Sequence, residues 1–386
     1  MVRRQVTKEQ LIQWRRHLHM YPELSFQEEK TSQFVYDILQ TFPNLEVSRP
    51  TKYSVMARLI GAKPGKVLAI RADMDALAIQ EENSFEFASR TPGVMHACGH
   101  DGHTAMLLGA ACELAYYKEK ICGEVRFLFQ HAEENFPGGA EEMVQAGVME
   151  GVDYVIGAHL WSPLDVGKIG IVYGAAMAAP DAFSITILGK GGHAGIPHET
   201  IDSIAIGTQL VSQLQQIVSR QTNPLDSLVL SVTEFHAGTT HNVIPDSATI
   251  AGTVRSLRHE LREQTAKRIE QIVKAVTEAY GASYTFQYNY GYRPVINDEY
   301  VTRRLEEAAV KLFGKDKLIR MSPTMAGEDF SAFLQKAPGC FFFIGARNEQ
   351  KGIVFPHHHP RFTIDEEALP IGSSLFVQAA LDFLGE

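Results

Sequence analysis

The segment from Met95 to Thr104 concentrates side chains that bind metal ions. It reads MHACGHDGHT and places three histidines, one cysteine and one aspartate within eight residues, separated by small residues. Thiolate and imidazole groups two residues apart suit a divalent ion such as zinc. A helix N-terminus capped by Asp101 or Thr104, with stray histidines, is the plainer alternative. No second ligand pair follows at zinc-finger spacing, so further ligands must come from elsewhere in the chain.

Candidates for those further ligands follow or occupy apolar runs. Glu133 and Glu134 come shortly after VRFLFQ, and His159 lies within VIGAHLW. Adjacent carboxylates at a strand end point different ways, so one can bind metal while the other acts as general base on a metal-bound water. The segment PHHHP, from Pro356 to Pro360, offers three more histidines. Taken singly, a solvated acidic pair, a core histidine and a polar loop explain these residues as well.

A second pair of carboxylates, Asp73 and Asp75, lies in RADMDAL after the apolar run KVLAI. The carboxyl ends of strands are where α/β proteins form their sites. Taken alone, a solvated turn is the simpler explanation of this pair.

The elements that must position these groups alternate between helix and strand. We predict strands at 54–60, 66–71, 124–130, 154–160 and 339–345, and helices at 7–20, 28–40, 103–117, 299–313 and 366–384. This alternation predicts an α/β fold with a mixed or parallel sheet. Residues 182–290 form two βαβ-like halves, which predict a compact α+β insert.

Composition excludes several classes of protein. The 386 residues carry a net charge of -9 and no basic run, so nucleic acid is not the expected partner. No apolar run is long enough to span a membrane, and the first residues do not read as a secretory signal. Four cysteines in so long a chain do not form a disulfide framework, which favours a reducing, cytoplasmic location.

The ordered motifs resemble the M20 family of metal-dependent amidohydrolases, most closely its M20D branch. They are RRHLHMYPELSFQEEKT, RADMDAL, HACGHDGH, AEE with GG, GAHL, GKGGH, NVIPD, GTVR, GEDFS and HHPRF. The resemblance covers nearly the whole chain. It implies hydrolysis of the amide bond of N-acetyl or aromatic N-acyl L-amino acids, which releases a carboxylic acid and a free amino acid. An M20 exopeptidase acting on short peptides, of the dipeptidase or aminoacylase type, is the alternative.

The resemblance also implies the roles of single residues. Its metal ligands would hold two divalent ions per subunit, zinc or manganese, with cobalt or nickel as further options: Cys98, His100, Glu134, His159 and His358. His358 is selected from the three histidines by the motif H-x-P-x-[FY]. Glu133 matches the general base, and Asp73 matches a carboxylate that orients a ligand. His131 departs from the family, which usually has proline there.

From the insert, His193, Asn242 and Arg255 match groups that hold the scissile carbonyl and the carboxylate of the substrate. The planar fork of arginine donors suits a carboxylate. The resemblance implies that this histidine comes from a partner subunit, and hence a homodimer or a dimer-based tetramer.

The resemblance implies a discontinuous catalytic domain, residues 1–177 and 293–386, and an inserted lid and dimerisation domain, residues 178–292. A hinge between such domains lets a lid exclude water. A metal-storage protein is a weaker reading, since storage needs neither a general base nor a carboxylate clamp. A Rossmann dehydrogenase is weaker still, since GKGGHAG lacks the order G-x-G-x-x-G.

Overall fold

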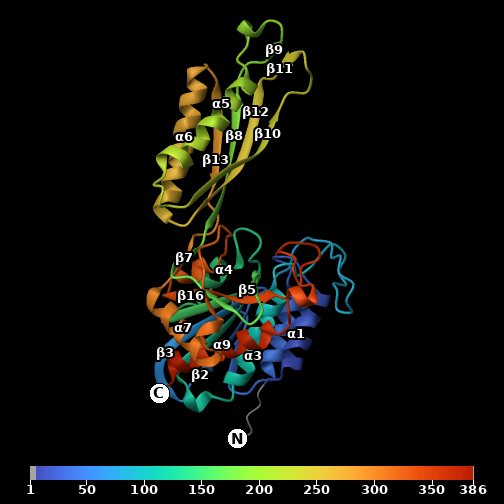
Figure 1. Cartoon of the computed structure of the whole chain (residues 1–386), viewed down its shortest axis with the longest axis vertical. Coiled ribbons are helices and arrows are strands. Elements are labelled where there is room, and N and C mark those ends of the chain that lie inside the picture. The colour runs from blue at the N-terminus through green and yellow to red at the C-terminus, as the bar shows by residue number, and fades with distance from the viewer. Residues whose placement is uncertain (1–5, 386) are drawn as a thin grey trace. The chain divides into compact units, whose positions relative to one another are not determined.

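The computed structural model describes residues 6–385 and shows two compact units (Figure 1). Unit 1 comprises the residues up to Ala176, Ile296–Ser322 and the residues from Asp329 onward. Unit 2 comprises Met177–Val295 and Pro323–Glu328. Short strands β7 (Gly174–Met177) and β14 (Val295–Asn297) pair where the chain passes between the two. Among the helices of residues 6–385, none has the length and apolar character that crossing a membrane requires.

Unit 1 is built on an eight-stranded sheet with the order β1-β2-β4-β3-β5-β16-β6-β15. Its strands are β1 Leu45–Ser48, β2 Val55–Ile60, β3 Lys63–Asp73, β4 Cys122–Gln130, β5 Tyr154–Asp165, β6 Ile169–Ile171, β15 Leu318–Arg320 and β16 Gly339–Arg347. The four central strands β4, β3, β5 and β16 are parallel, whereas β1, β2 and β6 join by antiparallel pairing. This mixed sheet confirms the predicted α/β class.

Helices cover the sheet of unit 1. They are α1 Lys8–Met20, α2 Glu29–Gln40, α3 His100–Leu114, α4 Gly139–Gln145, α7 Glu299–Phe313, α8 Ser331–Leu334 and α9 Ala368–Leu384. Short 3-10 turns occupy Lys118–Lys120, Lys315–Lys317 and Glu349–Lys351. The central strands read as continuous apolar runs because a parallel sheet is buried on both faces.

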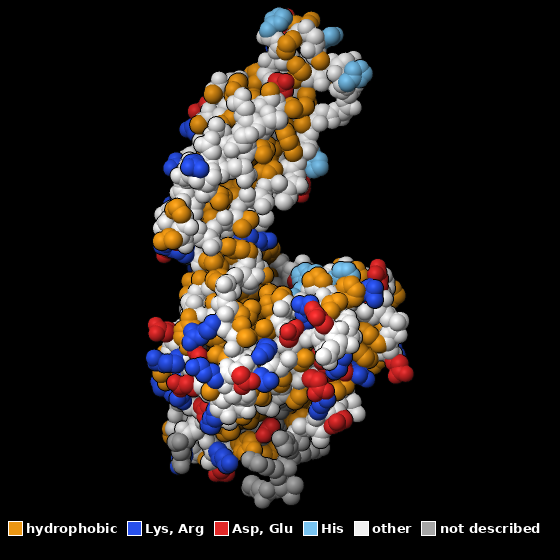
Figure 2. Space-filling model, viewed as in Figure 1, with side chains coloured by type: hydrophobic (Ala, Val, Ile, Leu, Met, Phe, Trp, Pro, Cys, Tyr) orange, Lys and Arg blue, Asp and Glu red, His pale blue; other side chains and the backbone are white. Residues whose placement is uncertain are grey.

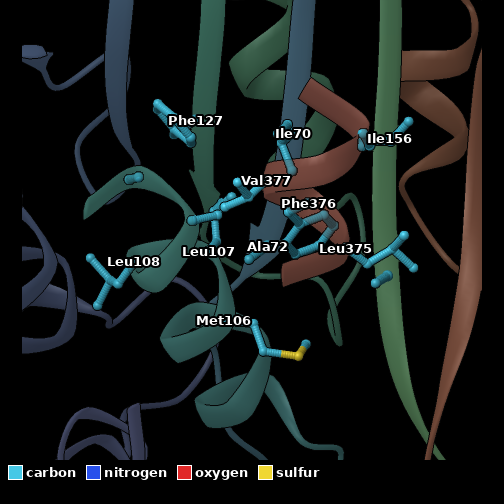
Figure 3. Close-up of a cluster of buried hydrophobic side chains, with 14 of the residues drawn as sticks. Ile70, Ala72, Met106, Leu107, Leu108, Phe127, Ile156, Leu375, Phe376 and Val377 are labelled. Atoms are coloured by element: carbon cyan, nitrogen blue, oxygen red, sulfur yellow. The ribbon is translucent and has the colours of Figure 1, made fainter. Parts of the chain in front are cut away.

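Helix α3 lies within the core of unit 1. All but one of its residues are buried, and it packs against α1, α9 and β3. Figure 3 shows Met106, Leu107 and Leu108 of α3 within one cluster of buried side chains that also includes Ile70 of β3 and Phe376 of α9. A helix buried on every side is apolar all round, which explains its Ala- and Leu-rich sequence.

The start of α3 differs from the predicted position. The helix begins at His100, three residues before the expected start, because Gly99 takes a left-handed conformation (φ 96) that ends the preceding loop. The first turn of the helix therefore carries His100, Asp101 and His103.

Unit 2 contains a four-stranded antiparallel sheet with the order β10-β12-β8-β13. Its elements are β8 Ala179–Leu188, β9 Gly192–His193, α5 Ser203–Gln216, β10 Leu228–Ala237, β11 Val243–Ile244, β12 Ser247–Ser256, α6 His259–Ala279 and β13 Ser283–Asn289, with a 3-10 turn at Pro197–Glu199 and a π-turn at Ile217–Gln221. Burial alternates along β12, and α5 and α6 pack on the sheet, so one face forms a separate apolar core.

The end of unit 2 that carries β9 and β11 exposes several histidines, drawn pale blue at the top of Figure 2. The exposed histidines of these loops and the adjoining strand are His193, His198, His236 and His241. The roles of lid and dimer contact assigned to residues 178–292 stay predictions.

Candidate metal centre

The metal-capable side chains of unit 1 meet at the carboxyl edge of its parallel strands. Asp73 is the last residue of β3, and His159 is the sixth of the twelve residues of β5. Glu133 and Glu134 follow the end of β4 closely. This edge is where open α/β sheets bind their ligands, because the connecting loops of neighbouring strands converge there.

Two groups of potential ligand atoms share one residue, Cys98. In the first group Cys98 lies with His100 and His159, and in the second with Glu134 and His358. The ligand atoms within each group lie within 4.8 Å of one another. Cys98 Sγ is 3.4 Å from His159 Nε2, and His358 Nε2 is 3.3 Å from Glu134 Oε1. The sequence-predicted ligands are thus brought together, although 260 residues separate the first from the last.

Both buried histidines use the nitrogen Nδ1 for a contact with an oxygen atom. His100 Nδ1 lies 3.0 Å from the backbone oxygen and 3.2 Å from the side-chain Oδ1 of Asp75. His159 Nδ1 donates to the backbone oxygen of Leu160 at 2.7 Å. Both Nε2 atoms therefore remain for a metal ion, the arrangement in which a second hydrogen bond orients a ligating imidazole.

Two buried ligand atoms lack a hydrogen bond within the described residues. These atoms are His100 Nε2 and Glu134 Oε1. Buried polar atoms are almost always satisfied, so such a pair needs an explanation. A metal ion bound at each of these atoms would supply one, and the soft and hard donors of this set suit transition-metal ions.

Asp73 and His103 form a different kind of contact. Asp73 Oδ1 accepts a hydrogen bond from His103 Nδ1 at 2.6 Å, and Asp73 Oδ2 accepts one from Arg71 at 2.7 Å. His103 Nε2 accepts the backbone N–H of Leu160 at 2.8 Å. Both nitrogens of His103 are thus used, so the neighbouring group of Asp73, His100 and His103 is not arranged to hold an ion.

Asp75, a carboxylate that the sequence offers beside Asp73 but to which the resemblance assigns no role, makes the closer contact with a predicted ligand. Asp73 Oδ2 lies 3.8 Å from His100 Nε2, whereas Asp75 is within hydrogen-bond distance of His100 Nδ1. Asp75 Oδ2 also accepts the backbone N–H of Glu134 at 3.0 Å. Both aspartates belong to the motif RADMDAL, and nothing in the motif ranks one above the other.

Burial and nearby charge set the protonation of the ligands. Burial lowers the pKa of His100, but the negative charges of Asp73, Asp75 and Glu134 outweigh it and raise that pKa to about 10. Burial and the nearby carboxylates raise the pKa of the Cys98 thiol. Burial and neighbouring histidines lower the pKa of His159. A metal ion bound here would displace protons from Cys98 and His100.

His357 precedes the exposed His358 and contacts the ring of His159. Its Nε2 accepts the backbone N–H of Ser162 at 3.1 Å, and burial lowers its pKa to about 3. Its ring meets those of His159 and Trp161 at centroid distances of 5.1 and 5.0 Å. A neutral, half-buried His357 therefore packs the loop against β5, while His358 is the histidine placed near Glu134.

The predicted substrate-binding residues of unit 2 lie at two separate places. His193 and Asn242 are neighbours, since β9 pairs with β11 and Ala194 N–H donates to Asn242 O at 3.1 Å. Arg255 lies near the far end of β12, opposite Pro180. Ser247, where β12 starts after β11, is eight residues from Arg255, or about 26 Å in an extended strand.

Arg255 is a cation available to a ligand. Its side chain is half-buried, and no ion pair or hydrogen bond joins it to another residue of 6–385. Burial lowers the pKa of its guanidinium, although the charge of Asp181 acts in the opposite direction. A half-buried guanidinium without a partner suits a carboxylate ligand.

Comparison with known proteins identifies the family of this chain. Residues 69–382 match the model of peptidase family M20/M25/M40. The chain belongs to this family. It is therefore a hydrolase of the M20 type, as its motifs predict.

Three relatives show how near the similarity is. The chain is 69% identical over 290 residues to an N-acyl-L-amino acid amidohydrolase of Geobacillus stearothermophilus, covering 75% of this chain and 78% of that protein. It is 43% identical to thermostable carboxypeptidase 1 of Saccharolobus solfataricus, covering 97% and 95%. Its fold matches the crystal structure of a dinuclear metal binding M20 peptidase of Bacillus subtilis, with TM-score 0.86, 37% identity and 98% coverage of both chains.

Proposed function

We propose that this M20 hydrolase cleaves the amide bond of N-acyl L-amino acids, with acetyl or aromatic acyl groups, and releases a carboxylic acid and the free amino acid. The observation that carries the proposal is the pair of ligand groups sharing Cys98, with the Glu133 carboxylate 4.0 Å from His100 Nε2. The similarity to an N-acyl-L-amino acid amidohydrolase supports the substrate class.

The donor set fits two divalent ions, with Cys98 as the shared ligand. His100 and His159 would complete one site, and Glu134 and His358 the other. Zinc or manganese suits this mixture of thiolate, imidazole and carboxylate, and cobalt or nickel are further options. When bound, such ions lower the pKa of a water toward about 7 and polarise a carbonyl oxygen.

The chain's own residues then perform the proton transfers and hold the substrate. Glu133 takes a proton from the attacking water and later delivers it to the nitrogen of the leaving amine. Arg255 receives the α-carboxylate through paired hydrogen bonds. His193 and Asn242 hold the oxygen of the scissile carbonyl as its charge develops.

The separation within unit 2 supports a homodimer, alone or within a dimer-based tetramer. The carbonyl and carboxylate of one N-acyl amino acid lie much closer together than the two ends of β12. His193 and Arg255 of one chain therefore do not hold the same substrate molecule. We infer that His193 and Asn242 serve the site of the partner subunit, and that residues 178–292 act as lid and dimer contact.

The test of the proposed function is the substitution Glu133→Gln. We expect this variant to bind two metal ions per chain, measured by elemental analysis, and to lose roughly 100- to 10,000-fold in kcat because its amide cannot carry the proton. A variant that keeps its kcat would contradict the role of Glu133. A wild-type protein without stoichiometric transition metal would contradict the whole site.

An exopeptidase activity is the second candidate, favoured by the similarity to a carboxypeptidase. Parallel assays of N-acetyl and N-benzoyl amino acids against simple dipeptides separate the two activities. We expect the larger kcat/KM for the acylated substrates, and a larger value for dipeptides would favour the exopeptidase.

A cytoplasmic location is also proposed, based on the sparse, unpaired cysteines.

A further inference from the structure

The backbone immediately before the proposed general base is held in an unfavourable conformation. Ala132 has φ 51, in the left-handed region that residues with a Cβ rarely adopt. Glu133 and Glu134 follow it directly, so the turn at Ala132 sets the directions of both carboxylates. Such a conformation persists only where the surrounding structure holds it in place.

Three hydrogen bonds hold this turn. The backbone N–H of Ala132 donates to Glu28 Oε1 at 2.7 Å. The backbone oxygen of Ala132 accepts the N–H of Gly139 at 2.9 Å. On the other side of Glu133, the N–H of Glu134 donates to Asp75 Oδ2 at 3.0 Å. The proposed base is thus flanked by two backbone N–H groups that donate to carboxylates.

Glu28 is buried in a way that packing does not explain. Its side chain is fully buried, and Oε2 has no hydrogen bond among the described residues. Burial and the negative charge of Asp75 raise the pKa of Glu28 to about 8. A buried acid with one unsatisfied oxygen costs stability, so an apolar residue would serve packing better. Its contact with Ala132 N–H is the feature that distinguishes it.

The loop that carries Glu28 also reaches Asp75. Ser25 Oγ donates to Asp75 Oδ2 at 2.7 Å, and Ala76 N–H donates to Glu23 O at 2.8 Å. The segment from Glu23 to Glu28 therefore lies along the residues after β3 and contacts the backbone after β4. One loop therefore makes hydrogen bonds to the segments that follow both β3 and β4.

We propose that Glu28 is a positioning residue of the hydrolytic site, which holds the left-handed turn at Ala132 and thereby aims the Glu133 carboxylate. The inference rests on the proposed function of Glu133. No hydrogen bond or ion pair joins Glu28 to a predicted ligand atom among the described residues, and we expect Glu28 to act through the backbone of Ala132.

The first test compares Glu28→Ala and Glu28→Gln in the full chain loaded with metal. Glu28→Ala removes the acceptor of Ala132 N–H, and we expect kcat to fall about 10- to 100-fold, the usual cost of losing an orienting partner. KM should stay within about twofold, because Arg255 is untouched. Glu28→Gln retains an oxygen that accepts this N–H, so we expect it to keep most of the wild-type kcat.

Glu23→Ala is the matched control. Glu23 is a carboxylate of the same loop that also accepts backbone N–H groups, those of Lys30 at 3.2 Å and Thr31 at 2.8 Å. Those groups belong to the start of α2 and not to the catalytic segment. We expect Glu23→Ala to lower the Tm while kcat stays at the wild-type value.

A second substitution tests the backbone directly. Glycine adopts positive φ without a steric penalty, so Ala132→Gly should remove much of the need for Glu28. We expect Ala132→Gly to restore part of the kcat lost in Glu28→Ala, and the two effects to be non-additive in a double-mutant cycle.

The outcomes separate this inference from the proposed function. If wild type does not cleave N-acyl amino acids, the proposed function fails first. If wild type is active and Glu28→Ala keeps its kcat, or Glu28→Gln loses as much kcat as Glu28→Ala, the positioning role is wrong. If Glu28→Ala does not fold, two other variants still test the positioning role. Glu28→Gln and the double variant Glu28→Gln with Ala132→Gly must both keep a kcat close to that of wild type, and a large loss of kcat in either would contradict the role.

Discussion

In each buried histidine of the predicted metal centre, Nδ1 makes the contact that orients the ring. Asp75 fixes Nδ1 of His100, and the backbone oxygen of Leu160 fixes Nδ1 of His159. A neutral imidazole has one donor and one acceptor nitrogen. When Nδ1 is the donor, Nε2 keeps a lone pair that can bind a metal ion. The chemistry of the centre therefore depends on residues that would not themselves be ligands.

Asp75→Ala tests this dependence at the residue scale. The substitution removes the side-chain contact with His100 Nδ1 and the acceptor of Glu134 N–H, while the backbone oxygen of residue 75 still faces His100 Nδ1. We expect metal affinity to fall about 10- to 100-fold, measured by titration of the metal-free protein with zinc.

Ser25→Ala is the control for Asp75→Ala. It removes one hydrogen bond to the same carboxylate but leaves both contacts of Asp75 with the ligand-bearing residues. We expect a smaller loss of zinc affinity than for Asp75→Ala. Equal affinities in wild type and Asp75→Ala would show that His100 is oriented by other groups.

Helix α3 is fastened to α1 by a buried charged network. Arg15 Nε donates to Asp101 Oδ2 at 2.7 Å, and His19 Nδ1 is 2.8 Å from the same oxygen. His19 Nε2 lies 3.1 Å from Glu81. Since Asp101 is in the first turn of α3, this network fixes the turn that carries His100.

The pKa of His19 gives this network a pH dependence. Burial and the charge of Arg15 lower the pKa of His19, but hydrogen bonds and charges of Asp101 and Glu81 outweigh them and raise it. A histidine whose folded pKa is raised stabilises the fold fully below its unfolded pKa of about 6.5, and this contribution is lost as the pH rises through the folded value.

His19→Gln should therefore destabilise the protein more at pH 6 than at pH 9. We expect a loss of about 1.5–3 kcal/mol in the free energy of unfolding at pH 6, the range for a hydrogen bond to a charged group, seen as a lower Tm.

His17→Gln on the same helix is the control. Burial lowers the pKa of His17, so its contribution falls as the pH falls, and its loss should matter less at pH 6 than at pH 9. Equal Tm losses of His19→Gln at both pH values would contradict a charged His19.

For the molecule as a whole, the positions of His193 and Arg255 are the basis of the proposed site shared between two subunits. The two residues are separated by most of β12 within one unit, yet both are predicted to hold one small substrate. A symmetric dimer resolves this, because each subunit would give His193 to its partner and receive the partner's copy in return.

Mixing two inactive variants tests the shared site. Glu133→Gln lacks the base but offers an intact His193, whereas His193→Ala has the base but not the histidine. We expect the mixture, after dissociation and reassociation, to recover N-acyl amino acid hydrolysis that neither parent shows. Each parent alone, taken through the same treatment, is the control. A mixture as inactive as its parents, with exchange verified by mass spectrometry, would place His193 in the site of its own chain.

The type of chemistry and most of the helices and strands can be predicted from local patterns in the sequence. Metal-capable residues cluster in HACGHDGH, and apolar periodicity locates the long helices and strands, because both signals are local. Helix α4 was not predicted, since its glycine-rich start resembles a loop, and the three-residue strands β6 and β15 are too short to show a period.

The orientation of the predicted ligands and the residues that support them depend on contacts between segments far apart in the chain. The contact of Glu28 with Ala132 joins residues 104 positions apart and leaves no periodic trace in the sequence. The same holds for the choice of Asp75 over Asp73 beside His100, and for the distance between His193 and Arg255 along β12. Spacing along the chain fixes which side chains share an element, whereas hydrogen bonds between distant segments depend on how the loops meet at the edge of the sheet.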